Sequence, residues 1–138
     1  MAITLDRVCN IFKELEKGDG AAFFEQVADN VDWIVEGTHP LAGHYLSKSD
    51  FQAHTFHKLA SVLPQCTQLR LEHALVSADT AVVELHSLAI ADNGLRFDNR
   101  YCRVCRFAAG KITQVRAYLG SALVARLFEA NPIPDAKN

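Results

Sequence analysis

The sequence lacks the features of several protein classes. No apolar run approaches the roughly 20 residues that a membrane-spanning helix needs. The formal charge of the 138 residues is only −2, so no positive excess indicates nucleic acid or an anionic membrane as a partner. The N-terminal stretch MAITLDRVCNIFKELEK has acidic residues within its apolar part and no small-residue cleavage site, which is not typical of a signal peptide. We therefore expect a cytoplasmic protein with neither a nucleic-acid nor a membrane partner.

Cysteine is too scarce and too irregularly spaced for a disulfide framework or a zinc site. The four cysteines are Cys9, Cys66, Cys102 and Cys105. Cys102 and Cys105 match the CxxC spacing, but the surrounding pattern predicts a strand, on which residues three apart point to opposite faces. A second CxxC pair is absent. We expect these thiols to be structural.

Other cofactor and catalytic motifs are also missing. The sequence has no serine triad, no phosphate-binding glycine loop and no dinucleotide fingerprint. His54 and His57 lie three apart in a predicted helix, but no inward acid accompanies them, so we expect a helix flank and no metal site. The sequence therefore predicts a protein that uses neither a metal nor an organic cofactor.

The composition is that of one globular domain. Hydrophobic residues make up 49% and charged residues 22% of the chain, and no repeat or linker interrupts it. A chain of this length can bury a substantial core. We predict a single domain over 1–138, with a mobile tail at 130–138.

Apolar periodicity predicts helices first and strands later. Helical spacing covers 4–17, Asp19 is placed to cap a short helix to residue 27, and Ser47 to cap a helix to about 63. Alternation predicts a strand at 31–37 and several more from residue 67 onward, and a last helix at 123–129. This order predicts an α+β fold.

The hairpin at 97–121 carries polar residues on one face. A three-residue loop with Gly110 in a left-handed conformation predicts three cross-strand pairs: Arg103 with Val115, Tyr101 with Ala117, and Asn99 with Leu119. An amide, a phenol and a guanidinium then share one face above an apolar floor. This mixture favours a small-molecule pocket.

The faces of the preceding strands depend on the turn near Gly94. A two-residue turn at Asn93 and Gly94 places Glu84 opposite Arg103 and His86 opposite Tyr101, inside the pocket. We prefer this register because it forms a favourable Glu84–Arg103 pair. A three-residue loop over 92–94 remains an alternative and turns Glu84 and His86 outward.

The element order, together with several short motifs, resembles the nuclear transport factor 2-like (NTF2-like) superfamily, and more narrowly its SnoaL-like and ketosteroid-isomerase-related branch. The motifs are the strand with Trp33, Pro40-Leu-Ala-Gly43, Asn99-Arg-Tyr101, Gly110-Lys-Ile112 and Arg116-Ala-Tyr118-Leu-Gly-Ser. The resemblance implies a cystatin-like cone, in which three helices of the N-terminal half and a short C-terminal helix wrap a curved antiparallel sheet. It also implies an inner pocket and a homodimer through the outer face of the sheet. Arg116 and Tyr118 are expected on that outer face, beside Val83 and Leu85.

The superfamily includes isomerases, cyclases, epoxide hydrolases and non-catalytic binders, so the fold does not choose a reaction. Where catalytic relatives present acids in the last strand, this chain has Ala117 and Gly120. An inward acid is also missing near Trp33, because Glu36 has the opposite parity. A direct transfer of these mechanisms therefore fails.

Two hypotheses follow. The first, favoured by the missing acids, is a non-catalytic binder of a small, largely apolar or carbonyl-bearing ligand. The second is a cofactor-independent isomerase, cyclase or hydrolase in which His86 is the general base and Tyr101 the hydrogen-bond donor. The expected ligand-binding residues are Trp33, Val35, His39, Glu84, Asn99, Arg103, Val115, Ala117 and Leu119.

Overall fold

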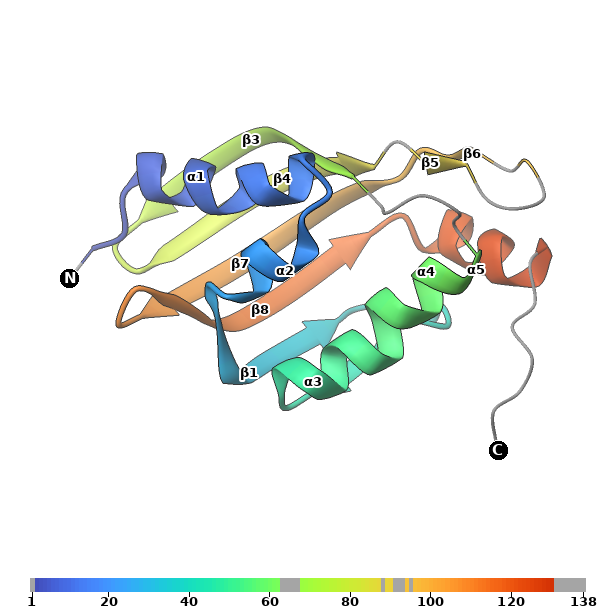
Figure 1. Ribbon diagram of the computed structural model, residues 1–138, viewed down its shortest axis with the longest axis horizontal. Coiled ribbons are helices and arrows are strands. Elements are labelled where there is room, and N and C mark those ends of the chain that lie inside the picture. The colour runs from blue at the N-terminus through green and yellow to red at the C-terminus, as the bar shows by residue number, and fades with distance from the viewer. Residues whose placement is uncertain (1, 63–67, 88, 91–93, 95, 131–138) are drawn as a thin grey trace.

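The computed structural model describes residues 2–62, 68–87, 89–90, 94 and 96–130, in which helices cover one face of a curved sheet (Figure 1). The helices are α1 (Leu5–Glu16), α2 (Gly20–Phe24), α3 (Lys48–Phe51), the π-helical turn η1 (Gln52–Phe56), α4 (His57–Val62) and α5 (Ser121–Ala130). The strands are β1 (Val27–Val35), β2 (Gly43–Tyr45), β3 (Leu69–Ser77), β4 (Thr80–Ser87), β5 (Ala89–Ile90), β6 (Arg96–Phe97), β7 (Arg100–Ala108) and β8 (Lys111–Leu119). The predicted α+β class is confirmed. The part of the predicted tail from residue 131 onward lies outside the described residues.

The helices begin at the predicted caps. Asp19 accepts a hydrogen bond from the Ala22 N–H at 3.0 Å, and Ser47 accepts one from Asp50 at 3.1 Å. These bonds satisfy N–H groups that the first helical turn leaves free. The second helix ends at Phe24, earlier than predicted, because Val27 already belongs to β1.

The main sheet has the strand order β2-β1-β8-β7-β4-β3, and a separate pair joins β5 to β6. β1 pairs with β8 in parallel, so the sheet is mixed and the purely antiparallel sheet of the prediction is wrong. This pairing brings Trp33 next to Val115 and Val35 next to Ala117. Residues from opposite ends of the chain therefore meet on the inner face.

The β7–β8 hairpin closes through a shorter turn than predicted. Ala109 and Gly110 both have positive φ, 52° and 80°, as in the two-residue turns that match strand twist. Ala108 therefore pairs with Lys111, and an irregularity near Phe107 shifts the register once more. The observed pairs are Tyr101 with Leu119, Arg103 with Ala117 and Cys105 with Val115. The predicted pairs are wrong by two positions, an even slip that leaves Tyr101 and Arg103 on their predicted inner face. Nearer the turn, Phe107 pairs with Ile112, which is fully buried.

The β4–β7 register differs from the preferred prediction by one residue. Leu85 pairs with Tyr101 and Glu84 with Cys102. This is the register of the three-residue alternative, and it exchanges the two faces of β4. Val83 and Leu85, expected on the outer face, are buried in the core at 0% and 1% exposure.

The β3–β4 pairing changes register along its length. Near the turn, His73 pairs with Glu84. Beyond it, an irregularity between Leu71 and His73 makes Leu71 pair with Leu85 instead of His86.

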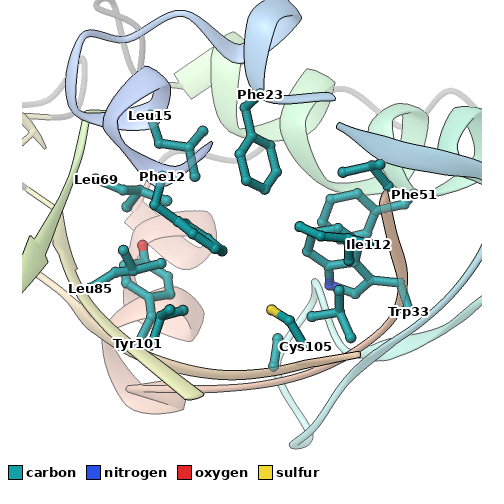
Figure 2. Close-up of a cluster of buried hydrophobic side chains, with 14 of the residues drawn as sticks. Phe12, Leu15, Phe23, Trp33, Phe51, Leu69, Leu85, Tyr101, Cys105 and Ile112 are labelled. Atoms are coloured by element: carbon teal, nitrogen blue, oxygen red, sulfur yellow. The ribbon is translucent and has the colours of Figure 1, made fainter. Parts of the chain in front are cut away.

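The core lies between the inner face of the sheet and the helices (Figure 2). Aromatic side chains from α1, α2, β1 and α3 meet there: Phe12, Phe23, Phe24, Trp33 and Phe51. Burying one side chain of this kind stabilises a fold by about 1.5–3 kcal/mol. Val124 and Leu127 of α5 extend this core beyond the aromatic cluster.

Candidate functional site

A small cavity opens on the inner face of the sheet, below α3, η1 and α4. Its volume is about 40 Å³. Strands β1, β7 and β8 form one side, and the loop before β2 and the helices form the other. The lining residues are Trp33, Val35, Leu41, Phe51, Thr55, Leu59, Tyr101, Arg103, Ala117 and Leu119.

One wall of the cavity is aromatic. The rings of Trp33 and Phe51 are stacked, with centroids 3.9 Å apart and planes 20° apart (Figure 2). Phe51, Thr55 and Leu59 follow one another at four-residue spacing, and the Thr55 hydroxyl donates to the Phe51 carbonyl at 2.6 Å. The π-helical turn η1 carries Thr55, and such turns are frequent at functional sites.

Arg103 is the charged group of this cavity. It is only 6% exposed, and its guanidinium carbon lies 5.5 Å from the Trp33 ring centroid and 5.7 Å from that of Tyr101. Its Nε and Nη1 atoms have no hydrogen-bond partner among the described residues, and neither does Nε1 of Trp33. Burial lowers the pKa of Arg103 because water no longer solvates its charge.

The hydroxyl of Tyr101 is held at the end of the cavity. Side-chain hydrogen bonds join it to Ser87 and Asn99, while burial, the larger effect, raises the pKa of Tyr101. Asn99 also donates from Nδ2 to the Gly120 carbonyl at 3.2 Å. A Cβ at Gly120 would overlap Asn99 Oδ1, so the amide fills the space into which a side chain at this position would project.

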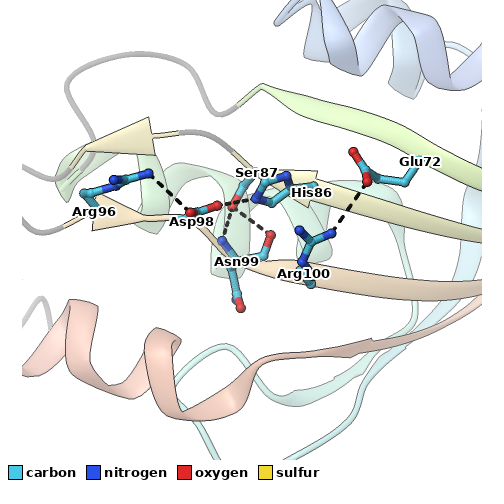
Figure 3. Close-up of polar contacts among 7 residues, drawn as sticks. All are labelled: Glu72, His86, Ser87, Arg96, Asp98, Asn99 and Arg100. Atoms are coloured by element: carbon cyan, nitrogen blue, oxygen red, sulfur yellow. Dashed lines mark hydrogen bonds and ion pairs between the residues drawn. The ribbon is translucent and has the colours of Figure 1, made fainter.

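His86 and Glu84 lie on the outer face of the sheet, so their predicted places in the pocket are wrong. Nε2 of His86 contacts Oδ1 of Asp98, whose other oxygen lies 3.4 Å from Arg96 (Figure 3). The hydrogen bond with His86 is the main reason why the pKa of Asp98 is lowered. Glu84 is 61% exposed and lies 3.4 Å from Nδ1 of His73. The one-residue change of the β4–β7 register accounts for both errors.

His39 is buried but does not line the cavity. Its Nδ1 accepts from the Leu41 N–H at 3.2 Å, and its Nε2 lies 3.1 Å from the Glu36 carbonyl, to which it donates. Burial lowers the pKa of His39 and outweighs the bond to Glu36. Both ring nitrogens therefore form hydrogen bonds with backbone groups next to the loop before β2, and neither is directed at the cavity.

The structure brings together six of the residues expected in the site: Trp33, Val35, Tyr101, Arg103, Ala117 and Leu119. Val115 is fully buried in the core, and Asn99 supports the cavity through Tyr101. The lining residues that the prediction missed are Leu41, Phe51, Thr55 and Leu59. The last three follow one another at four-residue spacing on one face of the helical segment after Ser47. Apolar spacing of this kind is the same whether the face covers a cavity or a core.

A second and larger hollow, of about 370 Å³, lies on the outer face. Its polar lining includes Glu72, Glu84, Arg100, Cys102 and Tyr118. The charges here face partners: Arg100 lies 3.6 Å from Glu72, as Figure 3 shows, and Glu84 is paired with His73. Among the described side chains that line this hollow, every buried donor has an acceptor, in contrast to Arg103.

The CxxC cysteines diverge as predicted. Cys102 faces the outer hollow, whereas Cys105 is buried inside, where burial raises the pKa of its thiol to about 12. Within the described ranges, no three His, Cys, Asp or Glu side chains gather in a way that could hold a metal ion.

Comparison with known proteins places this fold in a family. The family model of the SnoaL-like domain matches residues 8–115. The chain belongs to the SnoaL-like family. This family is part of the NTF2-like superfamily, so the predicted resemblance is confirmed.

Named relatives of this SnoaL-like chain are distant. It is 26% identical over 130 residues to the dimerizing cyclase phiC of a fungus (Fungal sp. strain ATCC 74256), covering 91% of this chain and 57% of that protein. An NTF2-like protein from Burkholderia thailandensis shares the fold with a TM-score of 0.76 and 22% identity, over 89% and 95% of the two chains. TerC, co-crystallised with polyporic acid, gives a TM-score of 0.74 and 16% identity, over 91% and 97%. Among the described helices, none is both long and apolar enough to span a bilayer.

Proposed function

We propose that this SnoaL-like chain binds a small, largely apolar molecule in the inner cavity. The observation that carries this proposal is the cavity itself, in which the stacked Trp33 and Phe51 wall meets the buried polar groups of Tyr101 and Arg103. Apolar walls with a few convergent polar groups are typical of ligand sites. Ala117 supports the proposal as well, because its small side chain leaves space beside Arg103, its partner across the β7–β8 pair.

Binding is favoured over proton transfer by the chemistry of the lining. Its described polar side chains are those of Thr55, Tyr101 and Arg103. The pKa of Tyr101 is raised, so its phenol is neutral near pH 7 and is a poor base. His86, the base of the catalytic hypothesis, lies on the other face of the sheet. TerC, which has the same fold, was co-crystallised with polyporic acid, and this supports a small-molecule role for the fold.

The ligand must widen the cavity. A volume of about 40 Å³ exceeds the ~10–15 Å³ that one water needs, but a cavity that accepts benzene measures ~150 Å³. Phe51 and Leu59, on either side of η1, are the side chains whose displacement would enlarge it. We therefore expect the helical cover, more than the sheet, to adjust on binding.

Fluorescence tests the binding proposal directly. Trp33 is the single tryptophan of the chain and forms part of the cavity wall, so a bound aromatic probe such as toluene or benzamide should change its emission. Ala117→Leu should abolish that change by filling the cavity. Ala108→Leu is the matched control, because Ala108 is exposed and lies at the end of β7 that is away from the cavity. If probes up to millimolar concentration leave both the emission and the melting temperature unchanged, the proposal is wrong.

A cyclase activity in the same cavity is the second candidate. The relative named a cyclase is the observation that favours it, although this chain spans only 57% of the length of that relative. Arg103 would then stabilise negative charge that develops on the substrate. If the protein cyclises a bound compound and Arg103→Met abolishes that turnover, this candidate is supported. Binding without product would favour the non-catalytic binder.

We also propose that the outer face of the sheet forms a homodimer. An apolar row crosses this face in register through Leu75, Val82 and Val104, and continues past Arg116 to Ile34. Leu75 is 60% exposed and Tyr118 46%, and exposed apolar surface of this kind indicates a partner. Light scattering at micromolar concentration should give twice the monomer mass, and Val104→Arg should halve it. A monomer at that concentration would contradict the dimer.

A further inference from the structure

We propose that the ligand of the inner cavity is an organic acid, whose oxyanion binds to Arg103 and to the indole N–H of Trp33. The proposal rests on the binding function above and names the chemical class of the molecule bound there. The ligand would consist of an apolar ring system, placed against Phe51, and one carboxylate or acidic enol group.

The first argument is that all the unpartnered buried atoms are donors. They are Nε and Nη1 of Arg103 and Nε1 of Trp33, and no other buried side-chain nitrogen or oxygen of the described residues lacks a partner. The two side chains pack against each other, with the guanidinium 5.5 Å from the indole centroid. A carboxylate is an acceptor-only group with about four lone-pair sites, so one such group can accept from several of these donors.

The second argument is that the protein supplies no anion for Arg103. Among the described residues, no carboxylate lies within ion-pair distance of it. Its neighbours Tyr101 and Cys105 are neutral near pH 7, because burial raises the pKa of both. Buried charges in proteins are almost always paired, so a guanidinium without a partner indicates that the partner comes from outside the chain.

The third argument separates this site from the outer hollow. Arg100 on the outer face is itself an arginine beside a hollow, but it lies 3.6 Å from Glu72 and is exposed to water. A ligand acid there would have to compete with that carboxylate and with solvent. Arg103 has neither competitor, so we expect the inner cavity, and not the outer hollow, to prefer an anionic ligand.

The experiment compares benzoate with benzamide, which has nearly the same shape without the charge. Binding is followed by Trp33 fluorescence and by calorimetry in the full chain, with Arg103→Met and the control Arg100→Met, which removes the arginine of the outer hollow. We expect benzoate to bind at least tenfold more tightly than benzamide in the wild type and in Arg100→Met. We expect Arg103→Met to bind the two equally.

Three results would overturn the proposal. Equal binding of both probes by the wild type would mean that water satisfies Arg103, while the pocket itself stands. A benzoate preference lost in Arg100→Met and kept in Arg103→Met would place the anion site on the outer face. Binding of neither probe would remove the proposed function and, with it, this inference.

A pH series and a second variant keep the test decisive if Arg103→Met does not fold. Arg103→Lys keeps the charge but offers a single ammonium in place of the planar donor set, so the benzoate preference should fall yet persist. In the wild type, the preference should disappear as the pH drops below the pKa of the probe's carboxyl, about 4 as for other carboxyl groups. A preference unchanged across that range would contradict an oxyanion contact.

Discussion

The two faces of β7 place the same kind of side chain in opposite circumstances. Arg100 points outward, is exposed to water and lies near Glu72, whereas Arg103 points inward and is buried without an anion. Only three positions separate them on one strand. The odd spacing alone sends one guanidinium to solvent and the other into the cavity.

This contrast indicates what each face is for. Exposed ion pairs such as Arg100–Glu72 contribute only about 0–1 kcal/mol to stability, because water and salt screen the charges. A buried cation without a partner costs stability, so its presence is better explained by ligand binding than by folding. The following variants compare the faces directly.

The largest difference between the faces should come from truncating a wall residue. Trp33 is fully buried in the ring stack, so Trp33→Ala should lower the free energy of unfolding by about 3–5 kcal/mol. Leu75→Ala on the outer face, where the side chain is 60% exposed in the single chain, should cost about 0.5 kcal/mol or less in the Val104→Arg background, which removes the proposed dimer. Urea denaturation measures both, and similar losses would contradict the assignment of the two faces.

Removing the buried charge of Arg103, unlike truncating Trp33, should not lower the free energy of unfolding. Arg103→Met replaces an unpaired guanidinium by an apolar side chain of similar length and should leave stability unchanged or raise it by about 1–4 kcal/mol. Arg100→Met should lower it by no more than about 1 kcal/mol. A clear loss of thermal stability in Arg103→Met, measured by calorimetry without ligand, would show that the guanidinium supports the fold.

The end of the cavity is sensitive to added volume. Gly120→Ala should destabilise the protein by about 1–3 kcal/mol, because its new methyl group meets the Asn99 amide. Combining it with Asn99→Ala should cost less than the sum of the two single changes, since the overlap disappears. Additive losses in urea denaturation would mean that the glycine does not need the space that Asn99 fills.

The smallest expected effect is a pH dependence from His39. The pKa of this imidazole is lowered from 6.5 in the folded protein, so the unfolded chain binds a proton first. Its contribution is fully present above pH 6.5 and is lost as the pH falls through the lower, folded pKa. His39→Gln should make stability less dependent on pH in this window, as melting curves in matched buffers would show. An unchanged slope would assign the dependence to other groups.

Sequence patterns were sufficient where one element decides its own structure. Local chemistry was enough to predict the caps Asp19 and Ser47, the hairpin around Gly110, and the inward face of Tyr101 and Arg103. It was not enough to place Glu84 and His86, because one residue more or less in the loop over 92–94 exchanges the two faces of β4. The cavity-lining residues of α3, η1 and α4 could not be predicted either, because an apolar helix face does not reveal whether it packs against side chains or covers a cavity.

The parallel pairing of β1 with β8 has a consequence for the order of folding. β1 carries Trp33 and β7 carries Arg103, and β8 is the strand that lies between them. A ribosome has therefore released most of the domain before the two halves of the site can meet. Because such distant contacts carry a large loop-closure entropy, we expect slow folding limited by the docking of β8. The inner cavity, which is the proposed ligand site, is thus among the last parts of the molecule to form.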